Sequence, residues 1–225
     1  MEALLIGVGG LGTAAALALT TATPVRLGLV DADVVDLSNL HRQLLYRLDE
    51  QSVAKVKAAE ARLKALVPGL EIESVQKRLD TVDALAEIMA RYPVTLDGSD
   101  NYTTRLAVND AALQVGKPLV HGAAIGWRGQ LMAIDPGRSA CLRCLFEEAP
   151  DEDGGCRREG VMGPVVAEIG RRMALEAVKI VSGSGEPLWN RMVTVDGWNN
   201  RRRTITIAAN SMCPACHAGT TQCRA

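Results

Sequence analysis

The stretch Gly7-Val8-Gly9-Gly10-Leu11-Gly12 follows the short apolar run Ala3-Leu4-Leu5-Ile6, and small residues continue to Thr20. This order predicts a buried strand, a turn and a helix. Glycines in such a turn let backbone N–H groups approach a phosphate at the positive end of the helix. We therefore expect a nucleotide-binding α/β fold, with Gly7, Gly9, Gly10 and Gly12 at the nucleotide. The alternative is that the glycines serve only the tight turn.

An acidic residue supports the nucleotide-binding interpretation. A second apolar run, residues 25–30, ends in Asp31, which lies nineteen residues after Gly12. A carboxylate at that place can accept hydrogen bonds from ribose hydroxyls. NAD, FAD and ATP are all bound by this kind of fold, so these residues alone leave the nucleotide open.

Strand and helix patterns alternate along the following residues. Helices are expected at 53–66, 82–92 and 103–115, and strands at 70–75, 94–96 and 119–123. Such alternation predicts a Rossmann-like, mainly parallel sheet with helices on both faces. Beyond residue 126 we expect a strand at 130–134, a helix at 163–181 and a closing antiparallel pair at 191–196 and 203–207. Arg201-Arg202-Arg203 is expected to form a charged turn before the last strand, although it could attract an acidic protein.

The length and charge of the chain limit the classes of protein to which it can belong. The 225 residues are 48% hydrophobic, which suits one large domain with a buried core. The 25 basic and 26 acidic residues nearly cancel, which argues against a dedicated nucleic-acid binder. Glycines interrupt the mostly apolar stretch Ala3–Leu19, and no later apolar run approaches the roughly 18 residues of a membrane span. No Lys or Arg precedes Arg26, which argues against a secretory signal. We expect a cytoplasmic protein without structural disulfides.

Four of the six cysteines occur as two Cys-x-x-Cys pairs, Cys141 with Cys144 and Cys213 with Cys216. This spacing lets both thiolates of a pair face one tetrahedral Zn²⁺, and two pairs supply its four ligands. The pairs are 68 residues apart, so the metal would tie the end of the chain to its middle. A closed four-cysteine site leaves no position for a reacting water, so we expect structural zinc. Redox-active dithiols are the alternative.

Further motifs follow one another along nearly the whole chain. They are Asp31–Gln43, Lys55, Leu96–Asn101 with Arg105 and Asn109, His121–Ala124, both cysteine pairs and Gly160–Pro164. In these motifs the chain resembles the adenylate-forming family of ThiF, MoeB and HesA, which is related to the adenylation domains of ubiquitin-activating enzymes. The resemblance selects ATP as the expected nucleotide.

The resemblance also implies which side chains meet ATP, and it links the acid at Asp100 to Mg²⁺ and catalysis. Attack of a carboxylate on an α-phosphate needs cations at the triphosphate and a carboxylate for Mg²⁺, which Arg42, Lys55 and Asp100 can supply. Each has a simpler alternative: Arg42 could cap a short helix, Lys55 could be solvated, and Asp100-Asn101 could only cap the following helix. The residues expected at ATP from the family are Gly9, Asp31, Ser38, Asn39, Arg42, Lys55, Asp100 and Asn101.

The resemblance implies a reaction and a partner. The C-terminal glycine of a small ubiquitin-like sulfur carrier ending in Gly-Gly, of the ThiS or MoaD type, would attack ATP, and a donor such as a cysteine desulfurase would then supply sulfur. The product would feed thiamine thiazole or molybdopterin synthesis. We expect one adenylation domain over residues 1–225, with a nucleotide-binding half (1–125) and a zinc-stapled, carrier-binding half (126–225), assembled as a homodimer. The alternatives are a nicotinamide-dependent dehydrogenase and a non-catalytic relative that only holds a carrier.

Cys156 is the remaining candidate catalytic residue. It lies in an acidic, glycine-rich loop before Arg157-Arg158, whose guanidinium groups favour its thiolate. In ThiF-like members the matching cysteine takes part in sulfur transfer or links to the carrier, whereas in MoeB-like members it is dispensable. The last cysteine, Cys223, is expected to be inert. His41, His121 and His217 show no catalytic partner in the sequence, so none is assigned a role.

One departure from the family concerns a cation. Members such as MoeB carry an N-terminal helix whose arginine reaches the ATP of the neighbouring subunit, and here the first expected strand starts almost at Met1. Three outcomes stay open: another cation such as Arg157 replaces that arginine, the start of the sequence is shortened, or the activity is reduced.

Overall fold

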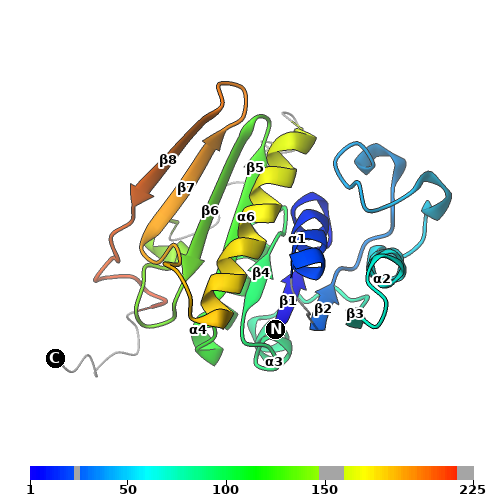
Figure 1. Ribbon diagram of the computed structural model, residues 1–225. Helices are drawn as coiled ribbons and strands as arrows, with labels where there is room; N and C mark the ends of the chain where they lie inside the picture. Colours follow the sequence, from blue (N-terminus) through cyan, green and yellow to red (C-terminus); the bar gives the residue numbers. More distant parts are fainter. Residues whose placement is uncertain (23–25, 147–159, 217–225) are drawn as a thin grey trace.

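The computed structural model describes residues 1–22, 26–146 and 160–216, and its centre is one eight-stranded sheet (Figure 1). The strand order across the sheet is β3-β2-β1-β4-β5-β6-β7-β8. Strands β1 to β5 run parallel, and β6, β7 and β8 each pair antiparallel with the strand before them. The strands are β1 (Glu2–Ile6), β2 (Arg26–Val30), β3 (Glu71–Val75), β4 (Thr95–Asp97), β5 (Leu119–Ile125), β6 (Arg128–Ile134), β7 (Arg191–Asp196) and β8 (Arg201–Thr206).

Helices cover both faces of the sheet, as the alternating sequence pattern predicts. The buried residues form two clusters: α1, α2 and α6 contribute to one, and α3 and α4 contribute to the other. In Figure 1, α1 and α6 lie side by side on one face. The helices are α1 (Gly10–Ala22), α2 (Lys55–Leu66), α3 (Val82–Met89), α4 (Tyr102–Val115) and α6 (Gly163–Ser182), with short 3₁₀ turns η1 (Leu37–Asn39), η2 (Leu48–Glu50) and η3 (Leu142–Cys144).

The expected α/β fold with an antiparallel extension is therefore confirmed. Strand β1 lies between β2 and β4, and the chain reaches these neighbours by crossing opposite faces of the sheet. Ligands of such sheets bind outside the carboxyl ends of the strands where the strand order reverses. The glycine turn follows β1 at this place, and the Gly98–Asn101 segment follows β4 beside it.

Several expected boundaries differ from those of the structure: the helix expected at 82–92 ends at Met89, and the strand expected at 130–134 begins at Arg128. Two further differences have local reasons. Helix α2 begins at Lys55 rather than Val53, because Val53 O accepts a hydrogen bond from Val35 N and Ala54 forms a bridge with Val34. Arg201-Arg202-Arg203 does not form a turn before a strand. These residues begin β8 itself, because they pair in register with residues 194–196 of β7.

No helix among the described residues is both long enough and apolar enough to cross a membrane.

Candidate active site and metal centre

The glycine turn between β1 and α1 is tightly packed, and among its glycines only Gly9 has space beside it. Gly7 has φ +85°, a conformation that L side chains rarely adopt, and a Cβ on Gly12 would lie 2.0 Å from the oxygen of Gly7. A Cβ on Gly10 would lie 2.6 Å from Val166 of α6. At Gly9 the nearest atom is Nε2 of Gln43, at 3.6 Å. Gly9 therefore leaves room for a ligand at the start of α1, where backbone N–H groups favour an anion.

Two side chains hold the main chain of Val8 within this turn. The Val8 N–H donates to Asp31 Oδ2 at 2.7 Å, and the hydroxyl of Tyr46 donates to the Val8 oxygen at 2.6 Å. Asp31 Oδ1 also accepts from the N–H of Asp33 at 2.8 Å. A carboxylate has about four acceptor positions, so these two bonds leave others free for ribose hydroxyls. Burial raises the pKa of Asp31, and the charge of Lys55 and the two backbone bonds offset it only in part.

Arg42 and Asn39 lie together beside the glycine turn. Nη2 of Arg42 donates to Asn39 Oδ1 at 2.6 Å, and Arg42 Cγ lies 3.7 Å from where a Cβ of Gly10 would be. Ser38 is exposed and donates from both its N–H and its hydroxyl to Asp36 Oδ1. These hydrogen bonds hold the pKa of Asp36 below its ordinary value. The segment that follows η1 thus places the side chain of Arg42 beside the glycine turn, with its guanidinium held by Asn39.

The ammonium of Lys55 is buried rather than solvated. Its side chain is only 6% exposed, and Nζ donates to Asp33 Oδ2 at 2.7 Å. The Lys55 N–H also donates to the Asp33 oxygen at 2.9 Å, which fixes the start of α2 next to the end of β2. An ammonium has three donors, and Asp33 accepts from one of them. Lys55 is therefore a preorganised positive charge close to Asp31.

Asp100 and Asn101 have different roles in the turn before α4. Asn101 caps the helix, because its Oδ1 accepts from the N–H of Thr104 at 2.8 Å. Asp100 is exposed, and its Oδ1 has a long contact of 3.4 Å with Nδ2 of Asn101. The capping alternative thus describes Asn101 and leaves the carboxylate of Asp100 directed toward solvent at the carboxyl end of β4.

The four cysteines of the two Cys-x-x-Cys pairs converge. Their sulfurs all lie within 4.8 Å of one another, with Sγ···Sγ distances of 3.9 Å (Cys141–Cys144), 3.7 Å (Cys141–Cys213) and 3.6 Å (Cys144–Cys216). A tetrahedral zinc with Zn–S bonds of about 2.3 Å requires neighbouring sulfurs about 3.8 Å apart. The four sulfurs match that requirement as a group, which favours a metal over two separate redox dithiols. Burial raises the pKa of the Cys141 thiol to about 12, so a cation is needed to hold this sulfur as a thiolate.

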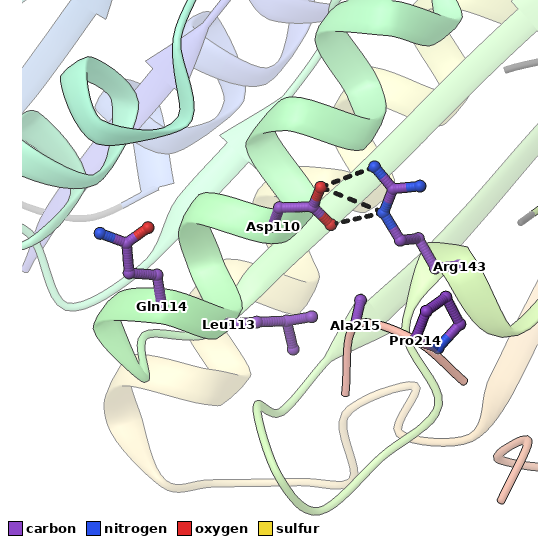
Figure 2. A pocket seen from close by; sticks show the side chains of 6 residues that line it. All are labelled: Asp110, Leu113, Gln114, Arg143, Pro214 and Ala215. Carbon is purple, nitrogen blue, oxygen red and sulfur yellow. Dashed lines mark hydrogen bonds and ion pairs between the residues drawn. The ribbon is translucent and has the colours of Figure 1, made fainter. Parts of the chain in front are cut away.

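Helix α4 connects the turn of Asp100 with the cysteine cluster. The completely buried Asn109 accepts a hydrogen bond from the N–H of Leu142 at 2.8 Å, and Asp110 forms a two-pronged ion pair with Arg143. A hollow of about 430 Å³ lies beside this ion pair (Figure 2). Its charged groups are engaged with each other, so we assign it no ligand. It is lined by Asp110, Leu113, Gln114, Arg143, Pro214 and Ala215.

A model of the ThiF family matches residues 1–215. The chain belongs to the ThiF family. It is 39% identical over 216 residues to the sulfur carrier protein ThiS adenylyltransferase of Escherichia coli, covering 96% of this chain and 85% of the relative. It is 38% identical over 226 residues to a sulfur carrier protein adenylyltransferase of Thermus thermophilus, covering 97% and 83%.

The fold of this ThiF-family chain is also similar to that of Escherichia coli MccB, whose structure was solved with ATP. The TM-score is 0.83 at 16% sequence identity, and the match covers 96% of this chain and 66% of MccB. The chain thus spans just under two thirds of that protein. At this identity the likeness concerns the fold alone.

Sequence reasoning gave no individual role to three side chains near the site of this ThiF-family chain, two of which, Asp97 and His121, lie within the motifs that resemble the family. Tyr46 is an aromatic residue in the crossover after β2, and its bond to Val8 spans 38 positions in the sequence. Asp97 ends β4 as Asp31 ends β2, which is the signal that could have drawn attention to it. No catalytic partner of His121 is visible in the sequence, and in the structure its Nδ1 lies 2.8 Å from Asp97 Oδ2. Cys156 and Arg157, like His217 and Cys223, lie outside the described residues.

Proposed function

We propose that this chain adenylates the C-terminal glycine of a small ubiquitin-like sulfur carrier, using ATP and Mg²⁺. The observation that carries the proposal is the gathering of Gly9, Lys55 and Asp100 around the carboxyl ends of β1, β2 and β4. The printed names of the two relatives above, both sulfur carrier adenylyltransferases, support it. Family membership over residues 1–215 supports the use of ATP.

The residues of the site fit the charges of this reaction. An oxygen of the carrier's terminal carboxylate attacks the α-phosphorus, the bond from that phosphorus to the bridging oxygen breaks, and pyrophosphate leaves. Negative charge grows on the phosphate oxygens, so fixed positive groups lower the barrier. Arg42, Lys55 and the N–H groups at the start of α1 supply them, and Asp31 orients the ribose. Asp100 would hold Mg²⁺, which neutralises phosphate charge when bound.

We propose zinc as the metal of the four cysteines, in a structural role. Four thiolates at tetrahedral spacing suit Zn²⁺ and leave no open position for a substrate. The site joins η3 to the segment after β8, both of which pack beside α4. In this proposal residues 1–225 are one adenylation domain, in which 1–125 bind the nucleotide and 126–225 are held by zinc and receive the carrier.

The exposed edge of the sheet is a suitable surface for the carrier. All six residues of β8 are exposed, and Arg202 is paired with Glu168 of α6 at 2.6 Å. Because side chains alternate along a strand, Arg201 and Arg203 lie on the opposite face from Arg202. We propose that these two arginines attract an acidic carrier.

We also propose that two copies of the chain form a homodimer. A cysteine desulfurase or another donor would supply the sulfur.

The test of the proposed function is ATP–pyrophosphate exchange with a carrier ending in Gly-Gly. We expect labelled pyrophosphate to enter ATP only when both Mg²⁺ and the carrier are present. A carrier that lacks its terminal glycine is the matched control, because it can dock but offers no correctly placed carboxylate. Binding of the carrier without exchange would identify a non-catalytic relative, and exchange of hydride with a nicotinamide would identify a dehydrogenase.

The choice of nucleotide gives a separate prediction. We expect titration calorimetry to detect binding of ATP with Mg²⁺ and none of NAD, because Arg42 and Lys55 suit a triphosphate. Lys55→Met keeps the length of the buried side chain and removes its charge, so it should weaken ATP binding. Tight binding of NAD without measurable binding of ATP would contradict the proposal.

Cys156 distinguishes two modes of sulfur delivery, and the prediction follows the sequence because this residue lies outside the described part. We expect Cys156→Ser to keep ATP–pyrophosphate exchange and to lose thiocarboxylate formation on the carrier when a sulfur donor is supplied. Mass spectrometry of the carrier's C-terminus reads the second step directly, because sulfur replaces oxygen there. Cys223→Ser is the matched control. Undiminished thiocarboxylate would mean that sulfur reaches the adenylate without Cys156.

A further inference from the structure

Asp97 and His121 form a buried pair that the proposed mechanism does not use. Asp97 is the last residue of β4, His121 is its partner in register on β5, and their side chains are 0% and 2% exposed. Nδ1 of His121 lies 2.8 Å from Asp97 Oδ2. A carboxylate buried this deeply is costly unless its oxygens accept hydrogen bonds.

The second oxygen of Asp97 holds the main chain that leads to Asp100. Asp97 Oδ1 accepts from the N–H of Ser99 at 3.0 Å. Burial alone would raise the pKa of Asp97, but the hydrogen bond and charge of His121 and the bonds from Ser99 outweigh it, so the pKa is lowered. The carboxylate is therefore ionised, and it bridges β5 to the turn after β4.

The rest of this turn is fixed on both sides of Asp100. The Gly98 N–H donates to the oxygen of Ile6 at 2.9 Å. The oxygen of Ser99 accepts from Nε and Nη2 of the buried Arg105 at 3.2 Å and 3.1 Å. Asn101 follows as the cap of α4. The main chain of the turn is thus held by β1, β5 and α4, while the side chain of Asp100 stays exposed.

We propose that His121 is a positioning residue for adenylation: by orienting Asp97 it fixes the Ser99–Asp100 turn and so aims the Asp100 carboxylate. The inference rests on the proposed function, in which Asp100 holds Mg²⁺. His121 itself need not touch ATP. Without its donor, one oxygen of Asp97 loses its partner in a buried site, the carboxylate rotates or takes up a proton, and the bond to Ser99 weakens.

A matched pair of amide variants tests this role. The amide nitrogen of His121→Asn can occupy the place of Nδ1 and donate to Asp97, whereas His121→Gln carries its amide one methylene further. We expect the Asn variant to stay close to the wild type in ATP–pyrophosphate exchange. The Gln variant should lose on the order of 10- to 100-fold in kcat, the size of effect that a displacement of about 1 Å produces in an active site. His121→Leu, which has no donor, should lose at least as much.

The Mg²⁺ requirement separates positioning of Asp100 from a general loss of structure. The Gln and Leu variants should need more Mg²⁺ for half-maximal exchange, with little change in the KM for the carrier. A folding defect would instead lower the amount of active protein at an unchanged Mg²⁺ requirement. If the Leu variant does not fold, the comparison of Asn with Gln still decides the question.

Two readouts are independent of activity. The Nδ1 proton of His121, hydrogen bonded to an ionised carboxylate, should give a low-field, exchange-protected NMR signal. That signal should persist in Asp100→Ala and disappear in Asp97→Asn. Binding of Mn²⁺ with ATP, followed by electron paramagnetic resonance, should weaken in the Gln variant and not in the Asn variant.

These readouts distinguish a failure of the inference from a failure of the proposed function. If the wild type shows no exchange with any carrier but the NMR signal and the Mn²⁺ pattern are as expected, the proposed function fails, and the role of His121 in aiming the Asp100 carboxylate stands. If His121→Gln and His121→Leu match the wild type in kcat and Mg²⁺ requirement, the inference is overturned. A folded Asn variant that behaves like the Gln variant also overturns it.

Discussion

Replacing Asp100 by Ala should lower the rate of ATP–pyrophosphate exchange by on the order of 10²-fold or more, the cost of removing one preorganised electrostatic group from a reaction of this type. The carboxylate is exposed, and its one described contact is a long one with Asn101. Its loss should therefore leave the melting temperature nearly unchanged. Exchange rates measured at saturating carrier, together with thermal unfolding, check both parts of the prediction.

Asp100→Asn is the matched control for charge. It keeps the size and polarity of the side chain but binds Mg²⁺ poorly, so it should be nearly as inactive as the Ala variant. Asp110→Asn offers a second control, because this residue of α4, the helix that follows the Asp100 turn, is paired with Arg143. It should keep most of the activity. Wild-type exchange in Asp100→Ala would remove Asp100 from the mechanism.

Removal of zinc is expected to give the largest loss of stability. Elemental analysis should find about one zinc per chain, because four ligands make one tetrahedral site. Binding of a structural zinc contributes about 10–16 kcal/mol in small zinc peptides, and part of this energy stabilises the fold. Because about 1 kcal/mol shifts the melting temperature of a protein of this size by roughly 2–4 °C, we expect metal loss to lower it by at least about 10 °C.

Cys213→Ser and a chelator should have the same effect, because Cys213 is buried in the cluster and its sulfur lies 3.7 Å from that of Cys141. Cys223→Ser is the control cysteine. Hydrogen exchange should show the loss of protection first in η3 and in the segment after β8, and next in α4, which contacts η3 through Asn109. A metal-free protein that melts at the same temperature as the loaded one would show that the four sulfurs need no metal.

The sequence predicted the order of the elements well, because apolar runs and their glycine and proline boundaries are local signals. Strand β7 was expected at 191–196 and lies at Arg191–Asp196, and α4 was expected at 103–115 and lies at Tyr102–Val115. The cysteine cluster could also be predicted, since the spacing of each pair already restricts where its thiolates point. The order of the elements and the spacing within each cysteine pair depend on residues that are close in sequence.

The side-chain contacts within the site could not be predicted in the same way. Asp97 ends the short strand β4 and Asp100 follows it, and only the packing of β5 beside β4 decides that Asp97 is buried and Asp100 exposed. Lys55 was expected at ATP, with solvation on its helix face as the alternative, but the sequence did not predict its contact with Asp33 across the β2–α2 crossover, which buries its charge. The hydrogen bond of Tyr46 to the glycine turn spans 38 positions in the sequence, more than the 22 between Lys55 and Asp33. Such contacts depend on the tertiary fold.

The positions of the four cysteines in the sequence also determine when the metal site can form during folding. Cys141 and Cys144 leave the ribosome well before Cys213 and Cys216, and α6, β7 and β8 lie between the two pairs. A complete metal site can therefore form only after the edge of the sheet has been synthesised and brought next to η3. Closing a loop of this length is entropically costly for a disordered chain and much less so once β5 to β8 are paired. Zinc binding should thus be a late folding event. It would stabilise only those chains in which the C-terminal strands are already correctly paired.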